Sequence, residues 1–202
     1  GKAKVALAGQ ALGDLNPDVH LEAVEEVFHA GNALDLISGC NLVLEGFDNF
    51  PGKFLANDAA VVSGIPLLSG GILRFRGQIL GIRPGVTACL RCVFYDQPPA
   101  HAVPSCAEAG VIGALAGVIG SLMAAEAIKI LCGMDDSILG KLIQFELKET
   151  QMRTIQIHRR QSCAVCGRSP SIRGLEAHRY TTEEAAFYNK FVFTRNDSRQ
   201  RS

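Results

Sequence analysis

Four of the seven cysteines form two Cys-x-x-Cys pairs, Cys89-Leu-Arg-Cys92 and Cys163-Ala-Val-Cys166. Together the pairs offer four thiolates, the ligand set of a tetrahedral structural zinc site with Zn–S bonds of about 2.3 Å. Because residues 93–162 separate the pairs, such a metal would join two distant elements of the fold. Two disulfides are the alternative. They are less favoured because redox-active Cys-x-x-Cys rarely occurs twice and we expect a reducing, cytosolic environment.

Asp48 is the main candidate for nucleotide chemistry. It lies just past the carboxyl end of the apolar segment Asn41–Glu45, which we predict to be a buried parallel strand. Ligands bind at the carboxyl ends of such strands, where a carboxylate commonly holds Mg²⁺ on a nucleotide phosphate. An N-cap of the following helix is the alternative role. Asn49 and Lys53 lie on the same segment and either contact phosphate or face solvent.

Cys106 precedes a long apolar segment predicted to be helical. A thiol at a helix N-terminus loses its proton more readily than a free thiol, so Cys106 is a candidate reactive group. A buried structural thiol is the alternative, and Cys40 and Cys132 are predicted to be core residues. Arg74 and Arg76 flank a predicted strand end, either as an anion site or as a charged strand edge.

The pattern of apolar residues predicts an α/β fold. Helices are expected at 1–15, 32–37, 53–63 and 107–131, strands at 20–27, 41–45 and 67–69, and extended chain at 72–83. The order strand, helix, strand over 41–69 is a βαβ unit, so part of the sheet is parallel. Residues 141–147 and 152–158 are predicted to form a hairpin that the second cysteine pair closes. A polar, mobile tail is expected over 168–202, with a short helix at 183–188.

The balance of charged residues limits the classes of partner that the protein is expected to bind. The 202 residues carry 20 basic and 20 acidic side chains, which argues against nucleic acid or an anionic membrane as the main partner. The uncharged run 109–125 contains Gly113-x-x-x-Gly117 and resembles a short membrane helix. A helix packed inside a protein or a dimer interface has the same composition, and we favour that interpretation.

Several sequence blocks occur together in a characteristic order. They are Lys2-Ala3-Lys4-Val5, Leu15-Asn16-Pro17, Glu45-Gly46-Phe47-Asp48-Asn49-Phe50, Asn57-Asp58, Pro66-Leu67-Leu68-Ser69-Gly70, Gly77-Gln78, both cysteine pairs, Pro104-Ser105-Cys106-Ala107-Glu108-Ala109-Gly110-Val111 and Gly117-Val118-Ile119-Gly120-Ser121. In this order the chain resembles the ThiF/MoeB/HesA family, bacterial relatives of ubiquitin-activating E1 enzymes. The resemblance covers residues 1–167, and it implies a partial E1-like domain.

The resemblance implies an adenylyltransferase. Such enzymes bind MgATP and the Gly-Gly tail of a small ubiquitin-fold sulfur carrier, adenylate the terminal carboxylate and release pyrophosphate, in thiamine or molybdenum-cofactor synthesis. Carried over by motif, Asp48 holds Mg²⁺ and phosphate, with Asn49 beside it, and Lys4 contacts the ATP phosphates. Cys106 corresponds to a loop cysteine that takes part in sulfur transfer in some members. The four paired cysteines are zinc ligands, and members are typically homodimers.

Two departures from the family pattern matter. The 202 residues contain no Gly-x-Gly-x-x-Gly loop, so the N-terminal βαβ half of a Rossmann-like sheet is missing, and we expect this chain by itself to be compromised. Glu45-Gly46-Phe47 stands where the family usually has Asp-Cys-Thr, and Phe47 is expected to crowd a nucleotide. A non-catalytic, zinc-stabilised module that binds a carrier or dimerises is therefore the alternative function.

Overall fold

A computed structural model describes residues 3–99, 109–134 and 136–180. Its centre is a mixed five-stranded sheet in the order β1-β2-β3-β4-β5. The strands span Val43–Glu45, Leu67–Leu73, Arg76–Ile82, Lys141–Glu146 and Gln151–Gln156. β1 and β2 are parallel, with Glu45 opposite Ser69, and the remaining neighbours are antiparallel. The predicted α/β class, βαβ unit and hairpin are therefore confirmed.

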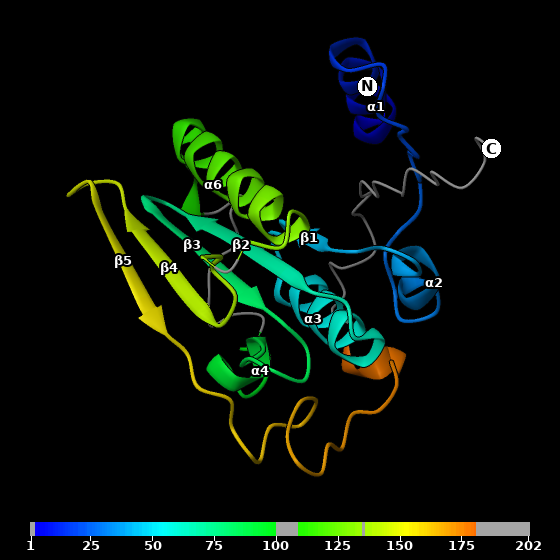
Figure 1. Ribbon diagram of the computed structural model, residues 1–202, viewed down its shortest axis with the longest axis vertical. Coiled ribbons are helices and arrows are strands. Elements are labelled where there is room, and N and C mark those ends of the chain that lie inside the picture. Colours follow the sequence, from blue (N-terminus) through cyan, green and yellow to red (C-terminus); the bar gives the residue numbers. More distant parts are fainter. Residues whose placement is uncertain (1–2, 100–108, 135, 181–202) are drawn as a thin grey trace.

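Two helices cover opposite faces of this sheet, and the N-terminal helix lies apart from it (Figure 1). The helices are α1 (Lys4–Leu15), α2 (Ala33–Ile37), α3 (Phe50–Ser63), α4 (Leu90–Val93) and α6 (Gly113–Leu131), followed by the 3₁₀ helix η1 (Ala177–Arg179). Local sequence sets the ends of α3: the Asn49 side chain accepts a hydrogen bond from the Gly52 N–H at its start, and Gly64 adopts φ +71° at its end.

Alternating apolar residues of the strands build a core on each face of the sheet. Leu67 and Leu80 pack with α2, α3 and the paired cysteines, whereas Leu68 and Ile79 pack with α6. Close contact on the second face depends on Gly77, since a Cβ there would lie 2.5 Å from Ile119 Cδ1. The sheet therefore separates the cysteine cluster from the long apolar helix.

Several predicted elements differ from the structure. Residues 20–27 contain isolated bridge positions at Glu22 and Val27 and form no strand. Leu44 is 47% exposed because only one side of the short β1 is covered, so a fully buried strand was the wrong expectation. Cys132 is exposed at the end of α6, which corrects its prediction as a core residue. The long helix begins at Gly113, later than predicted.

The C-terminal segment is packed beyond Gly167. Ile172 and Tyr180 are 4% and 6% exposed and belong to the core that contains the cysteines. The packed part of the chain therefore extends at least to Tyr180, and the domain boundary at Gly167 stays a prediction. The predicted short helix at 183–188 and the loop that carries Cys106 lie outside the described residues.

Candidate functional site

The two cysteine pairs converge on one buried cluster. Their four sulfur atoms lie within 4.8 Å of one another, with Cys89 Sγ 3.6 Å from Cys163 Sγ and Cys92 Sγ 3.4 Å from Cys166 Sγ. A zinc ion bound to four sulfurs at about 2.3 Å would hold them about 3.8 Å apart. The donor set and spacing therefore fit zinc, and the described cysteines are all free thiols rather than disulfides.

The protonation of the thiols is uneven within each pair. A hydrogen bond with Cys89 lowers the pKa of Cys92 to about 6, and hydrogen bonds with Cys166 and Cys89 also lower the pKa of Cys163. Hydrogen bonding to Cys163 raises the pKa of Cys166 to about 12 and raises the pKa of Cys89. Each pair thus has one thiol that readily becomes a thiolate, and metal binding would displace the remaining protons.

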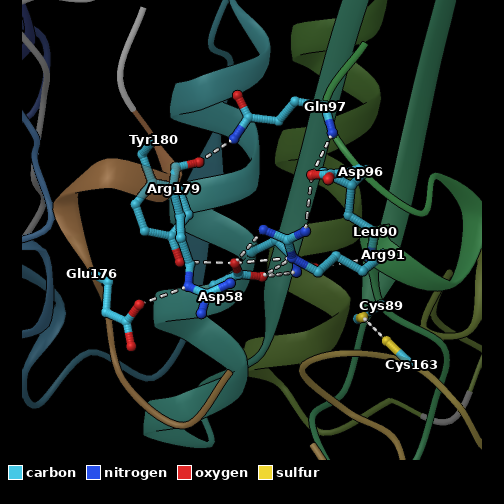
Figure 2. Close-up of polar contacts among 11 residues, drawn as sticks. Asp58, Cys89, Leu90, Arg91, Asp96, Gln97, Cys163, Glu176, Arg179 and Tyr180 are labelled. Atoms are coloured by element: carbon cyan, nitrogen blue, oxygen red, sulfur yellow. Dashed lines mark hydrogen bonds and ion pairs between the residues drawn. The ribbon is translucent and has the colours of Figure 1, made fainter. Parts of the chain in front are cut away.

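A buried ion pair fixes the first cysteine pair to α3. Arg91, which lies between Cys89 and Cys92, donates to both carboxylate oxygens of Asp58 at 2.8–3.0 Å, and the Tyr180 hydroxyl donates to the same carboxylate at 2.9 Å (Figure 2). The Asn57 side chain also accepts from the Leu90 N–H. Burial opposes the charge of Arg91, but its bonds to Asp58 outweigh burial and raise the guanidinium pKa. The first cysteine pair, helix α3 and the C-terminal segment are therefore held together by these buried contacts.

A cavity of about 710 Å³ opens beside the carboxyl end of β1. Its lining includes Asp48, Asn49 and Lys53 from the loop and the start of α3. Arg76 and Gln78 of β3 also line it. Its volume lies within the range of about 300–1,000 Å³ usual for small-molecule sites. The exposed Asp48 carboxylate at a strand end supplies the oxygen ligand that Mg²⁺ prefers. The cavity is therefore a fitting place for a magnesium-bound nucleotide.

The structure separates the two roles considered for Asp48. Asn49, and not Asp48, caps α3, because Asn49 Oδ1 accepts from the Gly52 N–H at 2.8 Å. Asp48 Oδ1 accepts a bond from Asn49 Nδ2 at 3.3 Å and its side chain stays exposed. Lys4 lies in the first turn of α1 and does not line the cavity. Its contact with ATP phosphates stays a prediction.

Phe47 and Arg76 also lie at this cavity. The Phe47 ring packs beside Phe28, with 5.8 Å between ring centroids, and covers Gly52 in the first turn of α3. Arg76 bonds Glu146 on β4 at 2.6 Å. Because β3 is paired with β2 and β4, Arg76 does not lie on an edge strand, so a charged strand edge was the wrong expectation, and its charge is paired with Glu146.

Two groups of functional interest carry no clear signal in the sequence. Asp58 and Arg91 are far apart in the chain, and only their place in the Asn57-Asp58 block and in the first cysteine pair marks them. The second group is Glu45, Lys53 and Ser69, whose side chains are joined by hydrogen bonds beneath the Asp48 loop. A buried Glu at a strand end beside a Lys four residues into a helix could have suggested such a contact.

The fold resembles that of solved structures, and the sequence matches a protein family. A mixed α/β sheet of this form occurs in MccB of E. coli, whose structure has a TM-score of 0.69, with 19% identity, over 84% of this chain and 52% of MccB. MccB has also been solved with ATP, and that structure has a TM-score of 0.66 and 19% identity. These likenesses establish the fold. Residues 1–165 match the ThiF family, and the chain belongs to that family.

Curated relatives are closer in sequence. The sulfur carrier protein adenylyltransferase of Thermus thermophilus is 42% identical over 180 residues, covering 87% of this chain and 66% of the relative. The adenylyltransferase and sulfurtransferase MOCS3 of Sus scrofa is 40% identical over 177 residues, covering 87% of this chain and 39% of that protein. The chain thus spans less than two thirds of the length of either relative.

Proposed function

We propose that this chain is the part of an E1-like adenylyltransferase that binds MgATP and the Gly-Gly tail of a small ubiquitin-fold sulfur carrier. The observation that carries the proposal is the exposed Asp48 carboxylate at the end of a parallel strand, facing a cavity of about 710 Å³. The names of the Thermus and MOCS3 relatives support the reaction class. The proposed setting is cytosolic sulfur transfer for thiamine or molybdenum-cofactor synthesis.

The proposed reaction joins the carrier carboxylate to AMP. A carboxylate oxygen of the terminal glycine attacks the α-phosphorus of ATP, the bond from that phosphorus to the bridging oxygen breaks, and pyrophosphate leaves. Asp48 would hold Mg²⁺, which neutralises the phosphate charge. Asn49 keeps the Asp48 loop in place by capping α3. The four paired cysteines are assigned a supporting role, because a closed tetrathiolate site has no open position for a reactant.

Pyrophosphate exchange into ATP, with a Gly-Gly carrier present, tests the proposal. Asp48→Ala should abolish exchange, whereas Asp35→Ala, an exposed acid on α2 that does not line the cavity, should leave it unchanged. Exchange that survives Asp48→Ala would show that the nucleotide lies elsewhere. Carrier binding without exchange in any form of the protein would favour the non-catalytic module.

The 202 residues contain no Gly-rich phosphate loop, and this lowers the rate of pyrophosphate exchange that we expect from them. Losing about three hydrogen bonds to charged phosphate, each worth about 1.5–3 kcal/mol, weakens ATP binding by roughly a thousandfold or more. The 202 residues by themselves should therefore exchange little pyrophosphate. The same chain joined to an upstream Gly-x-Gly-x-x-Gly strand–loop–helix unit should adenylate the carrier. Strong exchange by the 202 residues would overturn this expectation.

Cys106 is assigned to a step after adenylation. The resemblance supports this role, because Cys106 matches a loop cysteine that takes part in sulfur transfer in some family members, and a reactive thiolate suits sulfur transfer better than phosphate chemistry. Cys106→Ala in an active form should spare pyrophosphate exchange and lower formation of the carrier thiocarboxylate. Loss of exchange in this variant would place Cys106 in the first step instead.

A further inference from the structure

A group of buried polar contacts lies beneath the Asp48 loop. Glu45, the last residue of β1, is 4% exposed and its carboxylate is fully engaged. Lys53 Nζ donates to its two oxygens at 3.1 and 3.2 Å, the Ser69 hydroxyl donates to Oε1, and the Phe47 N–H donates to Oε2 at 2.9 Å. The last of these bonds holds the residue immediately before Asp48.

Lys53 closes the same loop from its other end. Its ammonium also donates to the Gly70 carbonyl in the middle of β2, so one side chain joins the first turn of α3 to both parallel strands. Its backbone N–H bonds the Asn49 carbonyl at 3.3 Å. The segment from Gly46 to Asn49 is thus fixed on one side by Glu45 and on the other by the first turn of α3.

These contacts decide between two roles for Lys53. A lysine on the wall of a nucleotide cavity would ordinarily be assigned to phosphate. Here the Lys53 side chain is 13% exposed, its charge is balanced by Glu45, and its donors are directed at three protein oxygens. A cation held in this way contributes by placing its neighbours more than by binding the ligand.

We propose that Lys53 is a positioning residue: through Glu45 and the Phe47 amide, it holds the Gly46–Asn49 loop so that the Asp48 carboxylate faces the cavity and can take Mg²⁺. The consequence for activity rests on the proposed function, but the effect on the loop does not. The inference predicts two separate changes in Lys53→Met, one in the loop itself and one in the use of Mg²⁺.

The loop is tested by hydrogen–deuterium exchange of the 202-residue chain. Lys53→Met should speed exchange of the Phe47 amide selectively, and Lys53→Arg, which keeps the charge and the donors, should retain most of the protection. Lys129→Met is the matched control, because Lys129 pairs with Glu126 at 2.5 Å, away from the cavity, and Glu126 also accepts from a backbone N–H. Native protection of Phe47 in folded Lys53→Met would overturn the proposal, as would a general loss of protection that Lys129→Met reproduces.

Mg²⁺ dependence tests the link to Asp48 in the form of the protein that exchanges pyrophosphate. Lys53→Met should raise the Mg²⁺ concentration for half-maximal exchange by about tenfold, the lower limit usual for groups that orient a metal ligand. An unchanged Mg²⁺ requirement would overturn the inference. If the wild-type chain joined to the upstream Gly-rich unit also exchanged no pyrophosphate, the proposed function would be refuted, and the Phe47 amide would still decide whether Lys53 holds the loop.

A second variant covers a folding failure. Lys53→Met leaves the Glu45 carboxylate buried without its cation, which is strongly destabilising. Should it not fold, Lys53→Met with Glu45→Gln removes both charges and keeps the shapes. That double variant should fold with a more rapidly exchanging Phe47 amide. Wild-type protection and an unchanged Mg²⁺ requirement in it would defeat the proposal.

Discussion

At the scale of single residues, chemistry depends on groups that the chain holds in defined surroundings. The four paired cysteines are buried together, and their sulfur spacing matches tetrahedral zinc. Asp48 is exposed because its neighbour Asn49 takes over the capping of α3. Phe47 finds room because Gly52 has no side chain. Each of these sites therefore depends on a partner residue as much as on the residue itself.

Removing one zinc ligand should remove the metal. We expect the reduced wild-type chain to hold one zinc ion, and Cys166→Ser to retain less than half an equivalent and to melt at a lower temperature, since metal binding and folding are coupled. Elemental analysis and thermal unfolding measure both. Cys132→Ser, an exposed thiol outside the cluster, should keep the zinc. A wild-type chain without zinc would contradict the assignment.

Because Phe47 packs on Gly52, we expect Gly52→Ala to destabilise the protein, although Gly→Ala in a helix usually stabilises. Gly→Ala in a helix usually stabilises by about 0.5–1 kcal/mol, but a Cβ at Gly52 would lie 2.3 Å from Phe47 Cδ1. We expect Gly52→Ala to lower the free energy of unfolding by about 1–3 kcal/mol. In a Phe47→Thr background the same change should become neutral or stabilising.

Denaturant unfolding of the two single variants and the double variant measures this coupling. Gly46→Ala, where a Cβ meets no atom within 4 Å, is the control and should not depend on Phe47. Additive effects of Phe47→Thr and Gly52→Ala would show that the ring does not rest on this turn.

At the scale of elements, one buried carboxylate joins three parts of the chain. Asp58 on α3 accepts from Arg91 in α4 and from the Tyr180 hydroxyl, which follows η1 (Figure 2). Because Arg91 lies between Cys89 and Cys92, this contact also sets the position of the first cysteine pair. The C-terminal segment therefore supports the cysteine cluster.

Tyr180→Phe should reveal this support. Burial, followed by the charge of Asp58, raises the pKa of Tyr180. A raised folded-state pKa means that its stabilising contribution is complete below the unfolded value of about 10 and is lost as pH rises through the folded-state value. Removing the hydroxyl should cost about 1.5–3 kcal/mol at neutral pH, the range for a hydrogen bond to a charged group.

Denaturant unfolding at neutral and alkaline pH measures both parts of the Tyr180 prediction. Tyr180→Phe should lower stability at neutral pH and flatten the decline at alkaline pH. Tyr95→Phe, on a side chain that is 74% exposed, is the control and should have little effect. Equal behaviour of the two variants would refute the role of Tyr180.

At the scale of the whole molecule, α6 covers one face of the sheet while much of its own surface stays open (Figure 1). It is long and apolar enough to cross a membrane, and 22% of its most apolar stretch is buried. Leu115, Ile119, Met123 and Ala127 face the sheet at helical spacing, whereas Val118, Ile128 and Leu131 are 37%, 62% and 58% exposed. The helix therefore has a core face and a second apolar face, which we propose as a homodimer interface.

The chain should stay in solution without detergent and sediment as a dimer. Ile128→Asp should shift it toward the monomer, because a charge would be buried at the contact. Leu15→Asp, on an 80% exposed side chain of α1, should leave the dimer intact. Sedimentation velocity distinguishes these cases. A wild-type monomer at micromolar concentration would refute the dimer, and firm membrane association would refute both expectations.

Local patterns in the sequence determined most of the elements and the identity of the chemical groups. Apolar periodicity is a property of neighbouring residues, so it predicted α1, α2, α3, the βαβ unit and the β4–β5 hairpin. The spacing of the cysteine pairs predicted that their thiols converge. The same reasoning failed at residues 20–27, where weak alternation is not matched by a pairing strand. It also could not show that Asn49 rather than Asp48 caps α3, since either side chain suits that position.

Tertiary structure alone decided which distant residues meet. Asp58, Arg91 and Tyr180 form one network. Lys53 lines the cavity but directs its ammonium at Glu45 and Gly70, because the βαβ crossover brings the end of β1, the middle of β2 and the start of α3 together. No local pattern encodes such contacts. A buried charge is costly unless it is paired, and the fold decides which partner lies within reach. Local sequence patterns thus identified the candidate functional groups, and the packing of elements that are distant in the chain determined which partner each group contacts.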